Sequence, residues 1–332
     1  MEEISPIELT ALAYLLSQLE CLESVQTGLI DYREAEELMD AIGKHQPKLK
    51  HLELRGVTFG SPNQWRTLLK LEGLETLVGD QFDSIGNGNL NCKLQRFVSH
   101  SPLPRPPFER ILHSSWTTLT SLAFAVNPDY ADLDLRRLKN LDTLRLVLEE
   151  DTSGTMEPPE PPSDLRSRLL HLQARRTADF VEQFCTMLRS AQLLPIKTLS
   201  ITVREDYIPQ AMKPHFLFDI LPPSIRHFGT VFEFLDPQAV NYLELVRAKR
   251  DGRLPQLEKI TIFPSEGDTE SYRRTPDPVE QSRCRQVEKE LGITVAFHST
   301  SPNLVTQGYL LEPYVEESDG EEEDEEGSEG YY

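Results

Sequence analysis

The chain has 332 residues, of which 38% are hydrophobic, and its formal net charge at pH 7 is −20. It contains no apolar run long enough to span a membrane, and the acidic start "MEEISPIEL" lacks the basic and apolar regions of a signal peptide, so we expect an intracellular protein, cytoplasmic or nuclear. This charge repels nucleic-acid phosphates and predicts that any electrostatic partner is basic.

The first half of the chain alternates helix signals with short leucine-rich strands. Ser5 and Glu8 in "SPIE" form a capping box for a first helix, and "LECLESV" (19–25) follows it. "DYRE" (31–34) opens the helix "AEELMDAIGKH" in the same way and leads to "LKHLEL" (49–54). Each helix is therefore expected to run into a strand.

The next segment repeats this order less regularly. "SPNQ" (61–64) begins the helix "WRTLLK", which leads to "LEGLETL" (71–77) and then to the weaker "LQRFVS" (94–99). Within residues 80–112, "GDQFDSIGNGNLNC" and "SPLPRPP" indicate loops, because glycine, proline and asparagine dominate them.

The clearest strand signals are "LTSLAF" (119–124) and "LKNLDTLRL" (138–146). Leu138, Leu141 and Leu144 would share one helix face, but the two-residue step to Leu146 fits a strand. This is the spacing of the short leucine-rich-repeat motif, L-x-x-L-x-L.

An acidic insertion separates this strand from the next one. "EEDTSGTMEPPEPPSD" (149–164) contains six acids and four prolines, which predicts a disordered loop. Residues 165–192 read as helix, broken near Thr177, and "IKTLSI" (196–201) is the next strand.

The last elements follow the same plan. "DPQA" (236–239) and "DPVE" (277–280) begin helices that end at Gly252 and Gly292. The strands of this part are "IRHFGTV" (225–231), "LPQLEKITI" (254–262) and "GITVAF" (292–297).

Aligned on their first apolar strand position, the strands predict an α/β leucine-rich-repeat-like solenoid over residues 1–311, with about nine or ten irregular repeats. The parallel sheet would form the concave face and the helices the convex face. A compact α/β domain is the alternative. Residues 312–332 are expected to be a disordered acidic tail, since 316–332 hold ten acids and no lysine or arginine. The anchor positions are 25, 52, 77, 97, 122, 144, 199, 228, 260 and about 293.

In such strands the leucines point into the core, so the residues between and beside them face the concave side. The alternative is that these side chains are merely solvated. Ser318, which is followed by acids, is a candidate phosphorylation site, and the alternative is an unmodified tail. The candidate protein-binding residues are His51, Glu53, Arg55, Thr143, Arg145, Thr198, Ser200, Thr202, Lys259 and Thr261.

No motif for catalysis, cofactor binding or metal binding occurs, so we expect no enzyme, no cofactor and no metal. Asp132 and Asp134 in "DLDL" lack a third ligand and precede a short helical turn. The four cysteines, Cys21, Cys92, Cys185 and Cys284, form no C-x-x-C pair and are expected to be free, buried thiols.

Three stretches resemble the leucine-rich-repeat part of fungal F-box/LRR-like proteins: "ALAYLLSQLECLESV", "LPPSIRHFGTVFEF" with the following "LELVRAKRDGRLPQLEKITI", and "VEKELGITVAF". The resemblance implies a substrate-recognition module, which would bind Skp1 of a cullin ubiquitin ligase only if an F-box is present. "SPIELTALAYLLSQL" looks like the first F-box helix, but no matching continuation follows, so we expect the chain to start inside the array.

The combination of repeats and a glutamate-rich tail also resembles acidic leucine-rich nuclear phosphoproteins, which bind histones. This second resemblance implies basic protein partners. Under either resemblance we expect a monomeric, non-catalytic protein-binding scaffold.

Overall fold

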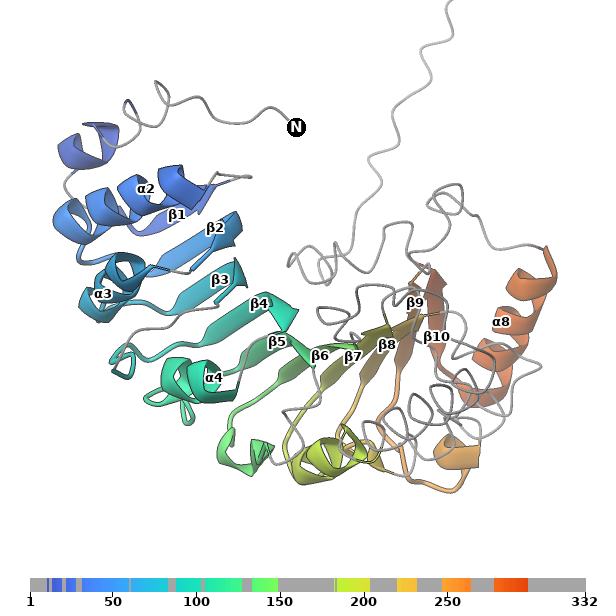
Figure 1. Ribbon diagram of the computed structural model, residues 1–332. Coiled ribbons are helices and arrows are strands. Elements are labelled where there is room, and N and C mark those ends of the chain that lie inside the picture. The colour runs from blue at the N-terminus through green and yellow to red at the C-terminus, as the bar shows by residue number, and fades with distance from the viewer. Residues whose placement is uncertain are drawn as a thin grey trace, which may run out of the picture.

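The computed structural model describes residues 11, 14–19, 22–27, 32–59, 61–82, 88–102, 105–126, 133–148, 182, 184–203, 220–231, 247–263 and 278–297. These residues form an α/β structure around one open sheet of ten strands, all parallel and arranged in chain order from β1 to β10 (Figure 1). The strands are β1 (Ser24–Thr27), β2 (His51–Thr58), β3 (Thr76–Gln81), β4 (Arg96–Pro102), β5 (Ser121–Val126), β6 (Thr143–Leu148), β7 (Thr198–Val203), β8 (His227–Val231), β9 (Lys259–Phe263) and β10 (Thr294–Phe297).

The sheet curves into an arc, and helices lie along its outer side (Figure 1). This arrangement is compatible with a solenoid, because each strand is bonded only to its neighbours in the sequence. The helical elements are α2 (Tyr32–His45), α3 (Pro62–Lys70), α4 (Arg105–Leu112), the 3₁₀ helix η2 (Leu135–Arg137) and α8 (Pro278–Leu291).

The strand register confirms the predicted anchors, with one correction. Val25 pairs with Leu52, and the same lateral row continues through each expected anchor to Ile260. The predicted last anchor, Ile293, is wrong by two positions, because Val295 is the partner of Ile260. Ile293 is buried just before β10 and belongs to the core.

One carbonyl before most strands accepts two hydrogen bonds from the next strand. The carbonyl of Glu23, for example, accepts from the backbone N–H groups of Lys50 and His51, at 2.9 Å each. Each such pair fixes where the following strand starts relative to its neighbour. The residues whose carbonyls accept two N–H groups in this way are Glu23, Lys50, Glu75, Gln95, Thr120, Asp142, Lys197 and Arg226.

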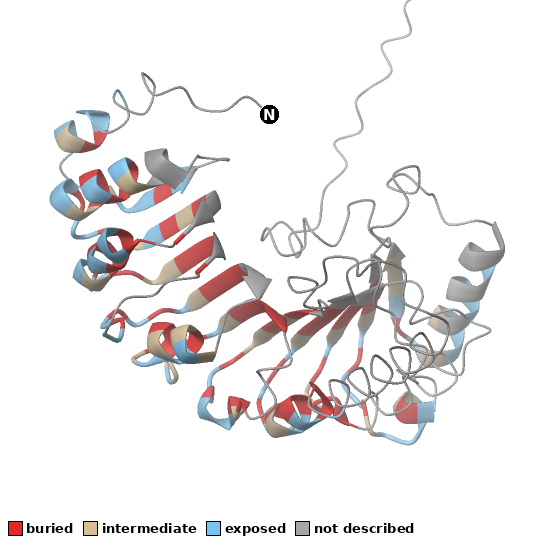
Figure 2. Cartoon of the chain, viewed as in Figure 1, coloured by how far each residue is buried: buried red, intermediate tan, exposed pale blue. Residues whose placement is uncertain are grey.

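The core lies between the strands and the outer helices. Leu52 and Leu54 of β2 are fully buried in the same apolar cluster as Leu38 and Ile42 of α2. Figure 2 shows buried positions running as a band across the strands. A row of aromatic rings with successive centroids 4.7 to 6.3 Å apart adds to this core: Phe59, Phe82, Phe97, Phe108 and Phe124.

Local signals explain where several helices begin and end. Ser61 and Gln64 form the expected capping box of α3: the Ser61 Oγ accepts from Gln64 N at 3.2 Å, and Ser61 N donates to Gln64 Oε1 at 3.0 Å. Gly252 and Gly292 adopt φ of +73° and +61° after their helices, as the predicted C-terminal stops require. The caps predicted at Ser5, Asp31 and Asp236 lie outside the described residues.

The prediction of a loop through "SPLPRPP" is wrong. Ser101 and Pro102 still belong to β4, and α4 begins at Arg105. Pro106 and Pro107 are tolerated because the first turn of a helix leaves its N–H groups without intrahelical partners. Phe108, one of the aromatic core residues, is buried on this helix.

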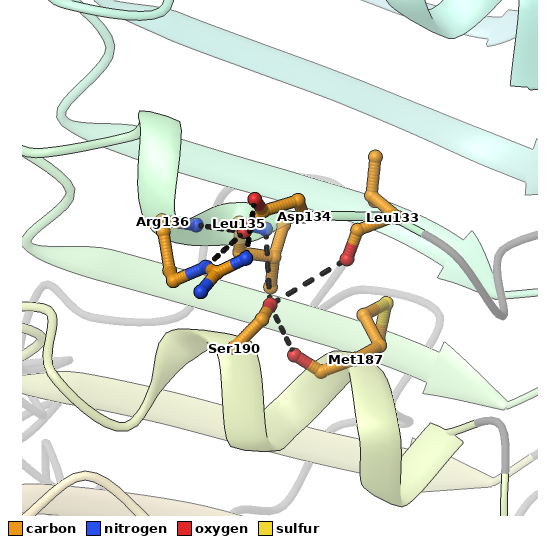
Figure 3. Close-up of polar contacts among 6 residues, drawn as sticks. All are labelled: Leu133, Asp134, Leu135, Arg136, Met187 and Ser190. Carbon is orange, nitrogen blue, oxygen red and sulfur yellow. Dashed lines mark hydrogen bonds and ion pairs between the residues drawn. The ribbon is translucent and has the colours of Figure 1, made fainter.

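A half-buried hydroxyl, that of Ser190, connects the two sides of the acidic insertion. The Ser190 Oγ, on the helix at 184–191, lies 2.6 Å from the Met187 carbonyl and accepts from the backbone N–H of Leu135 at 3.0 Å (Figure 3). It also lies 3.5 Å from the Leu133 carbonyl. Residues 133–137 and 184–191 are thus in contact, although the predicted disordered loop, 149–164, lies outside the described residues.

Among the described residues, no helix has the length and apolarity needed to cross a membrane. The tail at 312–332, with Ser318, also lies outside the described residues.

Candidate protein-binding face

The inner face of the sheet is formed by two rows of residues. Because side chains alternate along a strand, the residues on either side of each buried anchor point away from the helices. We name them the start row and the middle row. The start row is Ser24, His51, Thr76, Arg96, Ser121, Thr143, Thr198, His227, Lys259 and Thr294, and the middle row is Gln26, Glu53, Val78, Val98, Ala123, Arg145, Ser200, Gly229, Thr261 and Ala296.

The start row is polar along its whole length. His51 is exposed, and its Nδ1 lies 3.0 Å from the Thr76 Oγ1 on the next strand. Thr143, Thr198 and Lys259 are half-buried. The four start-row candidates from the sequence are therefore placed on one continuous face.

The middle row is more enclosed than the sequence indicated. Glu53 and Arg145 are half-buried, but Ser200 and Thr261 are only 6% and 9% exposed. These two residues therefore present little of their side chains on this face, and their part in binding a partner stays a prediction. Arg55 and Thr202 lie in β2 and β7, but their side chains are outside the described residues.

A small apolar cluster that was not predicted from the sequence lies on this face. Val78, Val98 and Ala123 are at most 2% exposed and form a cluster separate from the main core. Each directly follows a buried anchor, as in "LV", "FV" and "LA", so both faces of these strands are apolar there. These pairs of adjacent apolar residues are the sequence signal that could have identified the cluster.

Arg145 is the most perturbed charged group of the inner face. Burial, and to a lesser extent the positive charge of Arg96, lower the pKa of its guanidinium to about 10. Arg96, which was not among the predicted binding residues, is half-buried at the start of β4. Counting from the anchor Phe97 would have placed it in the start row beside Thr76 and Ser121.

The local charge of the inner face differs in sign from that of the whole chain. Among the described side chains of the two rows, Arg96, Arg145 and Lys259 are cationic and Glu53 is anionic. A partner of this face meets these groups rather than the net charge of −20.

Asp134, which was considered with Asp132 as a possible metal ligand, has a structural role. The Asp134 carboxylate accepts from Arg136 N at 3.0 Å and pairs with its guanidinium at 2.8 Å, so it caps η2. The Arg136 side chain is the main cause of the lowered pKa of Asp134. Asp132 lies outside the described residues, within which no group of three or more His, Cys, Asp or Glu could hold a metal ion.

The described cysteines are free and buried, as predicted for Cys92 and Cys185. Burial raises the pKa of the Cys92 thiol to about 11, and it also raises the pKa of Cys185. Neither environment favours the reactive thiolate. Cys21 and the side chain of Cys284 are outside the described residues.

No protein-family model matches the sequence, and a search of curated proteins finds no match to it.

Proposed function

We propose that this chain is a non-catalytic protein-interaction scaffold, built as a leucine-rich-repeat solenoid whose inner face binds another protein. Support for the repeat comes from the leucine spacing together with the paired N–H hydrogen bonds that recur before successive strands. The alternating core, with Leu52 and Leu54 inward and His51 and Glu53 on the other face, fits the same architecture.

The observation that carries the proposal is the continuous polar start row across ten strands. At about 4.8 Å between strands, ten strands span roughly 43 Å, which is enough for a standard protein interface. Rigid strands hold the row in place, so binding costs little ordering of the backbone.

Within this class, a substrate-recognition role like that of F-box/LRR ubiquitin-ligase adaptors is the more specific proposal. Its support is the resemblance of the three sequence stretches and the solenoid-compatible sheet. It requires Skp1 in the complex, since Skp1 connects an F-box to the cullin. A native pull-down without Skp1 would remove this role while leaving the scaffold proposal intact.

A second candidate is an acidic-tailed repeat protein that binds histones or other basic proteins. The ten acids within residues 316–332 favour it. Replacing those acids by their amides should then abolish a salt-sensitive complex with histones, whereas binding through the inner face should survive the replacement.

The scaffold proposal is tested by affinity purification from the native source with a charge reversal on the inner face. Lys259→Glu changes the start row, and Lys44→Glu is the matched control because Lys44 is exposed on α2. We expect quantitative mass spectrometry to show specific partners that are lost with Lys259→Glu and retained with Lys44→Glu. Partners that respond equally to both variants would contradict binding through the inner face.

A further inference from the structure

The N-terminal edge of the sheet leaves a recurring hydrogen-bond site without a partner strand. In eight successive strands, β2 to β9, the N–H group of the start-row residue and that of the residue before it donate to one carbonyl just before the preceding strand. His51 and Lys50, for example, donate to the carbonyl of Glu23 at 2.9 Å each. The equivalent pair of β1 is Ser24 and Glu23, but β1 is the first strand of the sheet and, within the described part of the chain, pairs only with β2.

The Ser24 N–H group points away from β2. His51, which aligns with Ser24, turns its N–H group toward β1, and the later start-row residues likewise turn theirs toward the strand before them. Ser24 holds the same position, so its N–H group lies at the outer edge of the sheet. Glu23 and Ser24 are both exposed. A further strand can therefore be added to β1 in parallel.

The opposite edge of the sheet is closed by a side chain. Thr294 N, on β10, donates to the Glu258 carbonyl at 2.8 Å, so the next N–H group, that of Val295, points outward. It donates to the Glu288 Oε1 of α8 at 2.9 Å. A carboxylate bonded to an outward N–H group keeps another strand from pairing there. No described side chain occupies the Ser24 N–H group in this way, so the two edges differ.

Apolar side chains at the β1 end are incompletely covered. Leu22 is half-buried, whereas Leu49, which holds the same position before the next strand, is fully buried. Leu15 and Leu19 are 55% and 46% exposed and share one face, since the Leu19 N–H group donates to the Leu15 carbonyl four residues earlier. The short helix at 14–18 lies beyond α2, at the same end of the sheet as β1 (Figure 1). In a stacked array such side chains are normally covered by a neighbouring unit.

The charges just before the strands indicate which residue fits beside Glu23. Residues at this position pair with oppositely charged neighbours: the Lys50 Nζ lies 2.8 Å from the Glu23 Oε1, and the Lys197 Nζ lies 2.6 Å from the Asp142 Oδ1. Glu23 is the first residue of this column, and its side chain is 68% exposed. A strand added to β1 places its own residue of this column next to Glu23, where a lysine or arginine is favourable.

We propose that β1 is a docking edge for an extended segment of a partner protein that carries a basic residue and alternating apolar residues. The segment adds to β1 as a parallel strand, and the carbonyl of its basic residue accepts the N–H groups of Glu23 and Ser24. The basic side chain pairs with the Glu23 carboxylate, and the apolar side chains continue the buried row that begins with Val25. The edge is separate from the inner face, and its occupancy does not depend on the proposed function.

A second copy of this chain fits the edge less well. Head-to-tail growth would bring β10 of one copy to β1 of the next, but the Glu288 carboxylate occupies the β10 edge. Pairing of β1 with a second β1 would bring two exposed Glu23 carboxylates to one junction and join two chains of net charge −20. The occupant is therefore a basic segment of a different protein.

The test uses the full-length chain and a fluorescein-labelled peptide "IKTLSI", followed by fluorescence anisotropy at low salt. This is the sequence of residues 196–201, whose lysine pairs with Asp142 in the fold. Its counterpart with Glu in place of Lys is the peptide control. We expect the lysine peptide to bind about threefold to tenfold more tightly, since the reversed charge replaces an attraction to Glu23 by a repulsion.

Three variants locate the site. Ser24→Pro removes the outward N–H group, which an edge strand tolerates, and should weaken binding of the lysine peptide by at least about tenfold. Ser24→Ala keeps the N–H group, so it is the matched control and should stay within about twofold of the wild type. Glu23→Gln, at an exposed position, should remove the difference between the two peptides. It tests the site even if Ser24→Pro disturbs the fold.

Equal binding of the lysine peptide by the wild type, Ser24→Pro and Glu23→Gln would overturn the docking edge, and so would the absence of binding to the wild type. Sedimentation equilibrium tests the occupant, and we expect a monomer. A wild-type dimer that Ser24→Pro converts to a monomer would show that a second copy fills the edge and would overturn the partner assignment. Partner capture that stays sensitive to Lys259→Glu in any of these cases leaves the scaffold proposal intact, because Lys259 lies on the inner face.

Discussion

The phenyl rings of Phe59 and Phe82 stack face to face, with centroids 4.7 Å apart and planes inclined by 3°. Gly79 of β3 lies directly against both rings: a Cβ built on it would be 2.6 Å from the Phe59 Cε2 and 2.8 Å from the Phe82 Cζ. The close approach of backbone and aromatic rings therefore depends on the absence of a side chain at this position.

Gly79→Ala is expected to lower the free energy of unfolding by about 1 to 3 kcal/mol, because the added methyl group forces two buried rings apart. Urea unfolding followed by circular dichroism measures this. Gly73→Ala is the control, since its nearest contact would be the Leu49 carbonyl at 3.8 Å. Equal stability of the two variants would show that the rings can move without cost.

Gln46 holds the helix at 14–18 against the remainder of the fold. Its Nε2 donates to the carbonyls of Leu16 and Leu19, at 2.7 Å each, and its Oε1 accepts from Leu22 N at 3.0 Å. Gln46 is 2% exposed, so Gln46→Leu leaves these groups without partners.

We expect Gln46→Leu to lower the free energy of unfolding by about 2 kcal/mol and to speed hydrogen exchange in residues 14–27. Gln18→Leu, at an exposed position, should change neither quantity appreciably. Unchanged exchange in Gln46→Leu would contradict the anchoring role.

Ser190→Ala tests the contact across the acidic insertion. The variant removes the acceptor of the Leu135 N–H, so we expect a loss of about 1 kcal/mol in unfolding free energy. Faster exchange of the η2 amides should accompany it. Thr186→Val, on the exposed side of the same helix, is the control; it should leave η2 exchange unchanged.

Cys92 should make stability depend on alkaline pH. Its pKa is raised from 9.0 to about 11 in the fold, so the native state keeps the proton while the unfolded chain loses it. Its contribution is fully present below about pH 9 and is lost as the pH rises through about 11, to a limit of about 2 to 3 kcal/mol.

The measurement compares the wild type with Cys92→Ala by urea unfolding at pH 8 and pH 10.5. Other groups that titrate in this range are common to both proteins, so the difference between them isolates Cys92. The wild type should lose more stability than Cys92→Ala between these pH values, and parallel losses would contradict the burial effect.

The strand positions were predictable because both apolar residues of each L-x-L pair point into the core and pack against those of the neighbouring strand. Nine anchors from Val25 to Ile260 fall in one lateral row. The tenth anchor was predicted two residues too early, because Ile293 is buried and apolar like a strand residue but lies just before β10. Apolarity alone does not distinguish a strand residue from the residue that leads into the strand.

Features that depend on distant segments were not predictable in this way. Pro106 and Pro107 indicated a loop, but the burial of Phe108 favours a helix there. The Arg96–Arg145 pair joins residues 49 positions apart, and only the register of β4, β5 and β6 brings them together. Sequence placed Arg145 on the inner face without revealing its charged neighbour.

The matching order of the strands along the chain and across the sheet has a mechanical consequence. Pulling the two ends of the sheet apart loads the hydrogen bonds between one strand and the next along their own direction, so they break row by row. The sheet should therefore lengthen under tension in many small steps at low force, with one strand detaching at a time, rather than rupture in a single event.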